Sequence, residues 1–254
     1  MNSIHSNAQI GEGTTVGAFS VVEENVKIGD NCWIGPNVTI MNGARIGDNC
    51  RVFPGAVISA IPQDLKYNDE DTLAEIGSNT TIRECVTINK GTTDRNTTKV
   101  GNNCLLMAYV HIAHDTFVGN NCIIANSANI AGHVDIEDWV IIEGVVAIQQ
   151  FVTIGQHAFI GGGSHVRKNV PPFIKAAREP LSYVGVNSIG LRRRGFENDV
   201  VTSIEDIYRA LYVHNNNITQ AVKAAEMELP SSKSKDLILN FIRHSDKGII
   251  RGPF

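Results

Sequence analysis

The sequence predicts a mainly β protein: a parallel β-helix of short stacked strands over residues 1–172, followed by a small α-helical domain over residues 173–254. Three observations predict this fold. An aliphatic residue recurs every six positions as far as Val166, turn-forming residues follow many of these aliphatic residues, and a helical pattern replaces the repeat beyond Pro171 and Pro172. Aromatic residues make up 6% of the chain and glycine 23 of 254 residues, as expected for a narrow core with frequent turns.

The six-residue repeat begins at Ile4 and fills 25 positions with Ile, Val or Leu, over residues 4–58, 76–88 and 100–166. A period of six fits neither an α-helix nor an alternating strand, but it fits one flat side and one corner per hexad. Such sides stack about 4.8 Å apart, so three sides per coil would give roughly eight coils and a prism about 40 Å long. The hexads themselves fix neither the number of sides nor the handedness.

The corners are indicated by the residues that follow the aliphatic position. Gly29, Gly47 and Gly119 each precede Asp-Asn or Asn-Asn, residue types that tolerate positive φ in tight turns. Two polar interruptions, 59–75 and 89–99, keep the register of the repeat. We expect them to be loops that leave the prism at corners, where specificity commonly resides.

Helical periodicity begins around Asn198. Further helices are predicted at 218–229, ended by Pro230, and at 233–245. The first helix places apolar residues on one face, namely Val201, Ile204, Ile207, Tyr208 and Leu211. We expect the helical domain to cover strand edges that the last coil would otherwise leave unpaired.

The overall charge of −4 offers no general attraction to nucleic acid, and no apolar run is long enough to span a bilayer. The N-terminal segment lacks a basic start followed by an apolar stretch, so we expect no secretory signal and a cytoplasmic protein. The charge is uneven, however. Residues 166–195 contain seven Lys or Arg and one Glu, a net of +6 that would attract an acidic partner.

Four of the five cysteines occupy one slot of the hexad, four residues after the aliphatic position, where other coils carry Ala, Val or Thr. They are Cys32, Cys50, Cys104 and Cys122. Packing as small buried side chains accounts for them without a disulfide or a metal. Cys85 lies in another slot and has no predicted role.

A polar cluster falls on one predicted corner. With 18 residues per coil, Gly132 stacks on His114 and Gln150 stacks on Gly132, with His111 and His133 nearby. A corner faces solvent, so the core does not require histidines there. Two chemistries fit: a metal site of the kind found in prism-shaped carbonic anhydrases, or one imidazole acting as a general base beside the Asp115 carboxylate. The residues alone leave both open.

The hexad pattern resembles that of the hexapeptide-repeat acyltransferases, and longer stretches resemble the UDP-N-acetylglucosamine O-acyltransferase family of lipid A synthesis. The matching stretches are QDLKY (63–67), IRECVTINKGT (82–92), HIAHD (111–115), AGHV (131–134), NVPP (169–172) and GVNSIGLRRRGF (185–196). The similarity covers essentially the whole chain. It implies a left-handed β-helix of triangular section and a homotrimer with active sites between subunits. It also implies transfer of a 3-hydroxyacyl group from acyl carrier protein to the 3-hydroxyl of UDP-N-acetylglucosamine, the first step of lipid A synthesis.

The resemblance also implies residue roles. His114 matches the family's general base, Asp115 would orient its imidazole, and the Gly132 amide matches the donor to the oxyanion. The positions that would hold the nucleotide sugar are Asp64, Lys66, Asn89, His111, His133 and Gln150, with Asn187 and Arg193 at its ribose and phosphate end. Gly162 matches the position that measures acyl-chain length, and because it has no side chain we expect a long chain. No metal or other cofactor is implied, since the acyl group arrives on the phosphopantetheine of its carrier protein.

Three positions depart from the family pattern. Asn89 and Gln149 stand where some members carry His, and Ile189 replaces an acidic residue near the uridine. These departures leave His114 and Asp115 intact but bear on nucleotide affinity. The alternatives are an acyltransferase that uses a 3-amino sugar nucleotide, a zinc-dependent prism-type carbonic anhydrase, and a non-catalytic or ice-binding scaffold. The scaffold is disfavoured because threonines do not form a regular array along the repeat.

Overall fold

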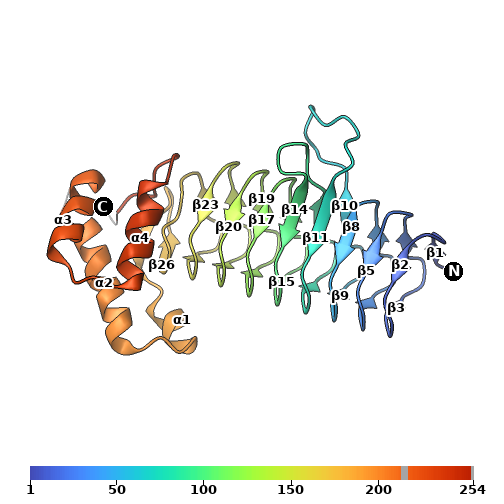
Figure 1. The fold of residues 1–254 in the computed structure, drawn as a ribbon, viewed down its shortest axis with the longest axis horizontal. Helices are drawn as coiled ribbons and strands as arrows, with labels where there is room; N and C mark the ends of the chain where they lie inside the picture. The colour runs from blue at the N-terminus through green and yellow to red at the C-terminus, as the bar shows by residue number, and fades with distance from the viewer. Residues whose placement is uncertain (213–216, 253–254) are drawn as a thin grey trace.

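Three sheets form the faces of a long prism, and a helical region covers one of its ends (Figure 1). The computed structural model describes residues 1–212 and 217–252. The parts of the predicted helical domain at 213–216 and 253–254 lie outside the described residues. Most strands of the prism are only two residues long, because a corner interrupts the chain in every hexad.

The first face contains, in spatial order, β1 (Ser3–Ile4), β4 (Val21–Val22), β7 (Thr39–Ile40), β10 (Val57–Ala60), β13 (Thr87–Asn89), β16 (His111–Ile112), β19 (Asn129–Ile130), β22 (Ala147–Ile148) and β25 (His165–Val166). The second face contains β2 (Gln9–Ile10), β5 (Lys27–Ile28), β8 (Ala44–Ile46), β11 (Leu73–Ile76), β14 (Thr97–Val100), β17 (Phe117–Val118), β20 (Asp135–Ile136) and β23 (Thr153–Ile154). The third face contains β3 (Thr15–Val16), β6 (Trp33–Ile34), β9 (Arg51–Val52), β12 (Thr81–Ile82), β15 (Leu105–Leu106), β18 (Ile123–Ile124), β21 (Ile141–Ile142), β24 (Phe159–Ile160), β26 (Ile174–Ala177) and β27 (Ser182–Val186).

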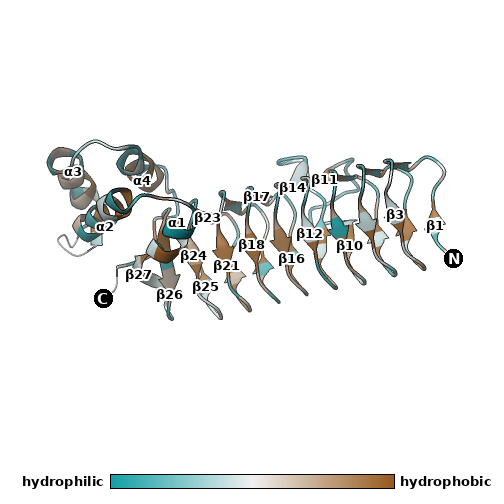
Figure 2. Cartoon of the chain, turned by 90° about the horizontal axis from the view of Figure 1, so that it is seen from below, coloured by the Kyte–Doolittle hydropathy of each residue, from teal (hydrophilic) through white to brown (hydrophobic). Residues whose placement is uncertain are grey.

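Successive coils pair in parallel and in register, with Ile112 aligned to Ile130 and Ile130 to Ile148. The aliphatic residue of each hexad points into the prism, and every such residue from Val22 to Val166 is buried. Figure 2 shows these hydrophobic strand residues recurring along the prism. Ile4 is 42% exposed because β1 has a neighbouring strand on one side only. The predicted parallel β-helix is therefore confirmed.

The four cysteines of the common slot are buried and free, as predicted, while Cys85 is half-buried and also free. Each of the four thiols lies within 3.6 Å of a backbone carbonyl of its own corner or of a neighbouring coil. These cysteines therefore serve as small core residues.

The chain leaves the prism twice at the corner between the first and second faces (Figure 1). Residues 61–72 join β10 to β11, and residues 90–96 join β13 to β14. We call these segments the first loop and the second loop. Both are shorter than the interruptions 59–75 and 89–99, because the flanking strands extend into them.

Beyond Val166 the chain adds two strands that the hexads did not predict. β26 pairs in parallel with β24, and β27 returns antiparallel to β26. Ile160 aligns with Ala176, an offset of 16 residues, so the coil containing Pro171 and Pro172 is two residues shorter than the others. These strands extend the third face beyond residue 172. The boundary between a β-helical domain and a helical domain at residues 172 and 173 stays a prediction.

Four helices follow: α1 (Ser188–Arg193), α2 (Asn198–Tyr212), α3 (Ile218–Glu228) and α4 (Lys233–Arg243). The last two agree with the predicted helices to within two residues, whereas α1 was not predicted. The apolar face of α2 is buried as expected, and the buried Tyr208 hydroxyl donates to the Pro172 carbonyl at 2.6 Å. This contact fixes α2 on the end of the prism. Within the described residues, no helix combines the length and apolar character needed to cross a membrane.

Candidate active site

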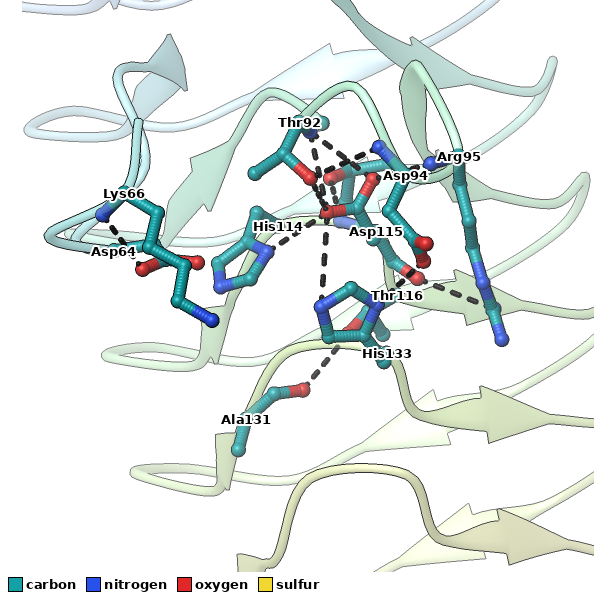
Figure 3. Close-up of polar contacts among 12 residues, drawn as sticks. Asp64, Lys66, Thr92, Asp94, Arg95, His114, Asp115, Thr116, Ala131 and His133 are labelled. Carbon is teal, nitrogen blue, oxygen red and sulfur yellow. Dashed lines mark hydrogen bonds and ion pairs between the residues drawn. The ribbon is translucent and has the colours of Figure 1, made fainter. Parts of the chain in front are cut away.

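His114 and Asp115 meet at the corner between β16 and β17. Asp115 has a φ of +57°, in the left-handed region that Asp tolerates better than most residues. On a straight strand the two side chains would point in opposite directions, but this turn brings them together. His114 Nδ1 lies 2.8 Å from Asp115 Oδ2, and both residues are buried. The corner thus forms an imidazole–carboxylate pair (Figure 3).

The second loop supplies further hydrogen bonds to the Asp115 carboxylate. The Thr92 hydroxyl donates to Oδ2 at 2.7 Å, the Thr92 amide to both oxygens at 3.0 and 3.1 Å, and the Arg95 amide to Oδ1 at 3.2 Å. Burial would raise the pKa of Asp115, but the hydrogen bonds from Thr92, His114 and Arg95 outweigh it and hold this pKa below its ordinary value. Asp115 is therefore ionised at neutral pH.

Gly132 lies directly against the His114 ring, in the next coil. A Cβ at position 132 would stand 2.7 Å from His114 Cε1 and 2.8 Å from Nε2. The neighbouring His133 amide donates to the His114 carbonyl at 3.1 Å, which confirms the predicted stacking of these coils. Within the described residues, the Gly132 amide donates no hydrogen bond. A free backbone donor therefore accompanies the imidazole.

His133 forms a second imidazole–carboxylate contact. Its Nδ1 lies 3.1 Å from Asp94 Oδ2 of the second loop, although the two groups are not aligned as a hydrogen bond. Its ring meets that of His114 edge to face, with centroids 5.0 Å apart, and stacks on Phe151 at 4.6 Å. His133 Nε2 lies 4.0 Å from Asp115 Oδ2. The two imidazoles and two carboxylates thus form one cluster.

His111 and Asn89 lie on the first face. His111 is in β16, in the same coil as His114, and Asn89 ends β13, the neighbouring strand in the coil before. His111 Nδ1 is 2.7 Å from Thr87 Oγ1, and burial together with the nearby His114 lowers the pKa of His111 below its ordinary value. Asn89 is buried, and its Nδ2 donates to the Ile61 carbonyl at the start of the first loop. Asn89 Oδ1 has no hydrogen-bond partner among the described residues, so an acceptor is left open there.

Asp64, Lys66 and Gln150 lie at the edge of the site. The Lys66 amide donates to Asp64 Oδ1 at 3.0 Å, and Figure 3 shows both residues on the first loop, on the opposite side of His114 from Asp115. The Lys66 and Gln150 side chains are exposed. Gln150 follows the predicted ladder, since the next amide, that of Phe151, donates to the Gly132 carbonyl at 3.4 Å.

Three predicted site residues lie at other corners of the same chain. Asn187 is buried at the start of α1, and its Nδ2 donates to the carbonyl of His157, at the corner between the second and third faces. Arg193 is exposed at the end of α1. Gly162 lies at the corner between the third and first faces, where its amide donates to Glu143 Oε2 at 2.9 Å. A single chain therefore does not bring these residues into contact with His114.

Sequence reasoning missed the roles of Thr92, Asp94 and Arg95. The second loop was recognised as an interruption of the repeat, and Thr92 belongs to one of the matching stretches. The spacing of a loop follows no period, however, so its contacts with Asp115 and His133 could not be read from the hexads. The signal that could have found them is a hydroxyl, a carboxylate and a guanidinium gathered in one short polar interruption, about one coil before His114 and Asp115 in the chain.

His114, Asp115 and His133 each offer an atom within 4.8 Å of the others, and they form the one group of three potential metal ligands found among the described residues. The donor set fits a metal poorly. The oxygens of Asp115 already accept hydrogen bonds from Thr92, Arg95 and His114. A carboxylate so occupied would have to lose several of these bonds to coordinate an ion.

The repeat that builds the prism is that of the bacterial hexapeptide transferases. Residues 25–60 and 97–132 match the bacterial transferase hexapeptide profile, and residues 169–250 match domain 2 of UDP N-acetylglucosamine O-acyltransferases. The chain is 42% identical to the acyl-[acyl-carrier-protein]–UDP-N-acetylglucosamine O-acyltransferase of Herminiimonas arsenicoxydans, over 99% of this chain and all of that protein. It is 43% identical to the protein of that name from Paraburkholderia phymatum, over 98% and 97%.

The crystal structure of LpxA, a UDP-N-acetylglucosamine acyltransferase from Bacteroides fragilis, superposes with a TM-score of 0.97 at 48% identity, over 98% of both chains. The protein therefore belongs to the family of UDP-N-acetylglucosamine O-acyltransferases. It is an enzyme with the family's left-handed β-helix, as the sequence resemblance implied.

Proposed function

We propose that this enzyme transfers a long 3-hydroxyacyl chain from acyl carrier protein to the 3-hydroxyl of UDP-N-acetylglucosamine, with His114 as the general base. The observation that carries the proposal is the buried pair formed by His114 Nδ1 and Asp115 Oδ2 at 2.8 Å. The carboxylate fixes the tautomer with a proton on Nδ1, which leaves Nε2 free to accept a proton. The ring edge bearing Nε2 faces Gly132.

In the reaction, His114 Nε2 takes the proton of the sugar 3-hydroxyl as its oxygen attacks the thioester carbonyl carbon. The carbonyl oxygen becomes an oxyanion, which accepts a hydrogen bond from the Gly132 amide. Collapse of the tetrahedral intermediate breaks the carbon–sulfur bond, and the imidazolium returns its proton to the departing thiolate. Asp115 stays ionised throughout and stabilises the imidazolium. A thiolate leaves readily, so these steps need no metal or other cofactor.

The positions of several side chains support the substrate roles that the resemblance implies. His133 and Gln150 follow His114 at the same corner of the next two coils, and His111 precedes it in β16. Asn89 offers an open acceptor, and the first loop, which carries Lys66, leaves the prism at this same corner. We assign these residues and Asp64 to the nucleotide sugar. We assign Asn187 and Arg193 to its ribose and phosphate end. Because those two lie at another corner of their own chain, we infer a homotrimer in which neighbouring subunits complete each site.

The basic segment 166–195 is proposed to attract acyl carrier protein through complementary charge, which predicts weaker binding at high salt. Part of its charge is already engaged. Arg194 lies 3.1 Å from His157 Nδ1 and over the Trp139 ring, and Arg167 pairs with Glu179 at 3.6 Å. A cytoplasmic location accords with five free cysteines, which persist in reducing compartments.

The test is acyl transfer to UDP-N-acetylglucosamine by purified wild-type and His114→Ala enzymes. Loss of the general base should lower kcat by about a hundredfold to ten-thousandfold. A variant with full activity would overturn the mechanism. Donors with fourteen- and sixteen-carbon chains should outperform a ten-carbon donor, since Gly162 leaves room. A 3-amino acceptor used more efficiently than the 3-hydroxyl sugar would identify the other acyltransferase reaction.

The zinc alternative rests on the proximity of His114, Asp115 and His133. It predicts about one zinc per subunit, CO₂ hydration and inactivation by a chelator. We expect instead that acyl transfer persists after treatment with EDTA. Elemental analysis and a CO₂-hydration assay on the same preparation distinguish the two reactions.

A further inference from the structure

We propose that Arg95 is a positioning residue, which clamps the second loop to the prism so that the loop can hold Asp115 in place. This inference rests on the proposed roles of His114 and Asp115. The loop is anchored by backbone hydrogen bonds at its start, where the Lys90 amide donates to the Ala60 carbonyl, and at its end, where the Leu73 amide of β11 donates to the Asn96 carbonyl. Its middle is exposed at residues 93 and 94.

The Arg95 side chain connects this exposed middle to two coils of the prism. Its Nη1 and Nη2 donate to the two oxygens of Asp135 at 2.6 and 3.1 Å, a bidentate pair of fixed geometry. Nη1 also donates to the Asp115 carbonyl at 3.2 Å, and the guanidinium lies 4.8 Å from the centre of the Phe117 ring. Figure 3 shows the side chain running along the prism, with its guanidinium end joined to the Asp115 carbonyl oxygen by a dashed line.

The same residue touches the catalytic pair through its backbone. The Arg95 amide donates to Asp115 Oδ1, and three residues earlier the Thr92 amide and hydroxyl donate to the same carboxylate. The side-chain contacts therefore fix the segment whose amides define the carboxylate's position. If the segment moved, Asp115 would lose donors, and His114 would lose the group that sets its tautomer and angle.

An ordinary surface ion pair is the competing explanation. The Arg95 and Asp135 side chains are 27% and 40% exposed, and pairs of that exposure contribute little to global stability. The positioning role makes a different prediction: the effect should appear in kcat rather than in unfolding. It should also depend on the carboxylate of Asp115.

Arg83 provides a matched control. It pairs with Glu84 at 3.0 Å and lies 4.6 Å from the centre of the Phe53 ring, so it repeats the ion pair and the aromatic contact. It follows β12 on the third face and does not touch the second loop in any described contact. Arg83→Ala should therefore leave acyl transfer unchanged.

The experiment measures kcat, KM for UDP-N-acetylglucosamine and melting temperature for Arg95→Ala, Asp135→Asn and Arg83→Ala. We expect Arg95→Ala and Asp135→Asn each to lower kcat about tenfold, as for other groups that orient a catalytic side chain, with KM changed less than about twofold. The Arg95→Lys variant, which keeps the charge without the fork, should recover part of the loss. Melting temperatures should match that of Arg83→Ala.

The positioning role is tested by asking whether the effect of Arg95→Ala depends on the Asp115 carboxylate. In an Asp115→Asn enzyme, adding Arg95→Ala should lower kcat no further, because the group being positioned is already compromised. The proposal would be overturned if Arg95→Ala had the same kcat as Arg83→Ala. It would also be overturned if Arg95→Ala lowered kcat by the same factor in the Asp115→Asn enzyme as in the wild type. These outcomes are separate from those of the general-base test, because Arg95→Ala can keep full activity even if His114→Ala loses it.

Discussion

Replacing Gly132 by alanine should slow catalysis while leaving the fold intact. The new Cβ would lie 2.7 Å from His114 Cε1 and 2.8 Å from Nε2. Carbon atoms in ordinary contact are at least about 3.5 Å apart, so the ring must move by about 0.8 Å. The ring cannot yield freely, since its Nδ1 is bound to Asp115 and its side chain is 6% exposed.

A displacement near 1 Å at a reacting group can cost about a hundredfold in rate. We therefore expect kcat/KM to fall about a hundredfold, equivalent to about 2.7 kcal/mol of transition-state stabilisation. Global stability should change by less than about 1 kcal/mol, because Gly132 does not adopt a positive φ and alanine restricts the unfolded chain. The assay is acyl transfer from a long 3-hydroxyacyl carrier protein, with urea unfolding monitored in parallel.

Gly144→Ala is the matched control. Gly144 also lies at a corner without a positive φ, and a Cβ there would meet only the Asn126 carbonyl oxygen, at 3.2 Å. We expect near wild-type kinetics for this variant. Unchanged kcat in Gly132→Ala would show that His114 is not confined as described. If Gly132→Ala lost activity and folding stability together, the effect would come from a disturbed backbone and not from a displaced His114 ring.

The remaining predictions concern stability. Burial and the Arg194 charge lower the pKa of His157 to about 4, below about 6.5 in the unfolded chain, so the unfolded state binds more protons between these values. Stability should fall by at most about 3 kcal/mol as the pH drops from 6.5 to 4, and His157→Asn, which suits the φ of +59°, should flatten this decline in urea titrations. Cys122→Ala should cost about 1 kcal/mol in the same measurement and leave the rate of acyl transfer unchanged, whereas a large loss of activity would contradict a packing role.

The repeating part of the fold could be predicted from the sequence because each hexad faces the same environment. A single rule therefore places Ile28 and Ile160 alike, and both are buried. The rule fails where the environment changes. At Pro171 and Pro172 the coil shortens, so Ala176 rather than a six-step aliphatic aligns with Ile160, and β26 goes unpredicted.

The candidate site likewise contains residues that the repeat places and residues that it does not. His114, Gly132 and Gln150 could be aligned because the 18-residue coil places them one above another. Thr92 and Arg95 could not, because they reach Asp115 from a loop whose path depends on the Arg95 contact with Asp135. The assignment of Asn187 to the ribose and phosphate end stays a prediction, and its contact with His157 could not be read from the repeat because it depends on how the end of the chain folds back on the prism.

The two ends of the prism differ in how they are covered, and this sets where the molecule should open. Each coil contacts only its neighbours, so local unfolding propagates coil by coil from an uncovered end. At the N-terminal end Ile4 is 42% exposed, whereas at the other end Tyr208 of α2 is fully buried. Amide protons of the first coils should therefore exchange with solvent well before those around His114. Transient opening of the first coils would then leave the catalytic corner assembled.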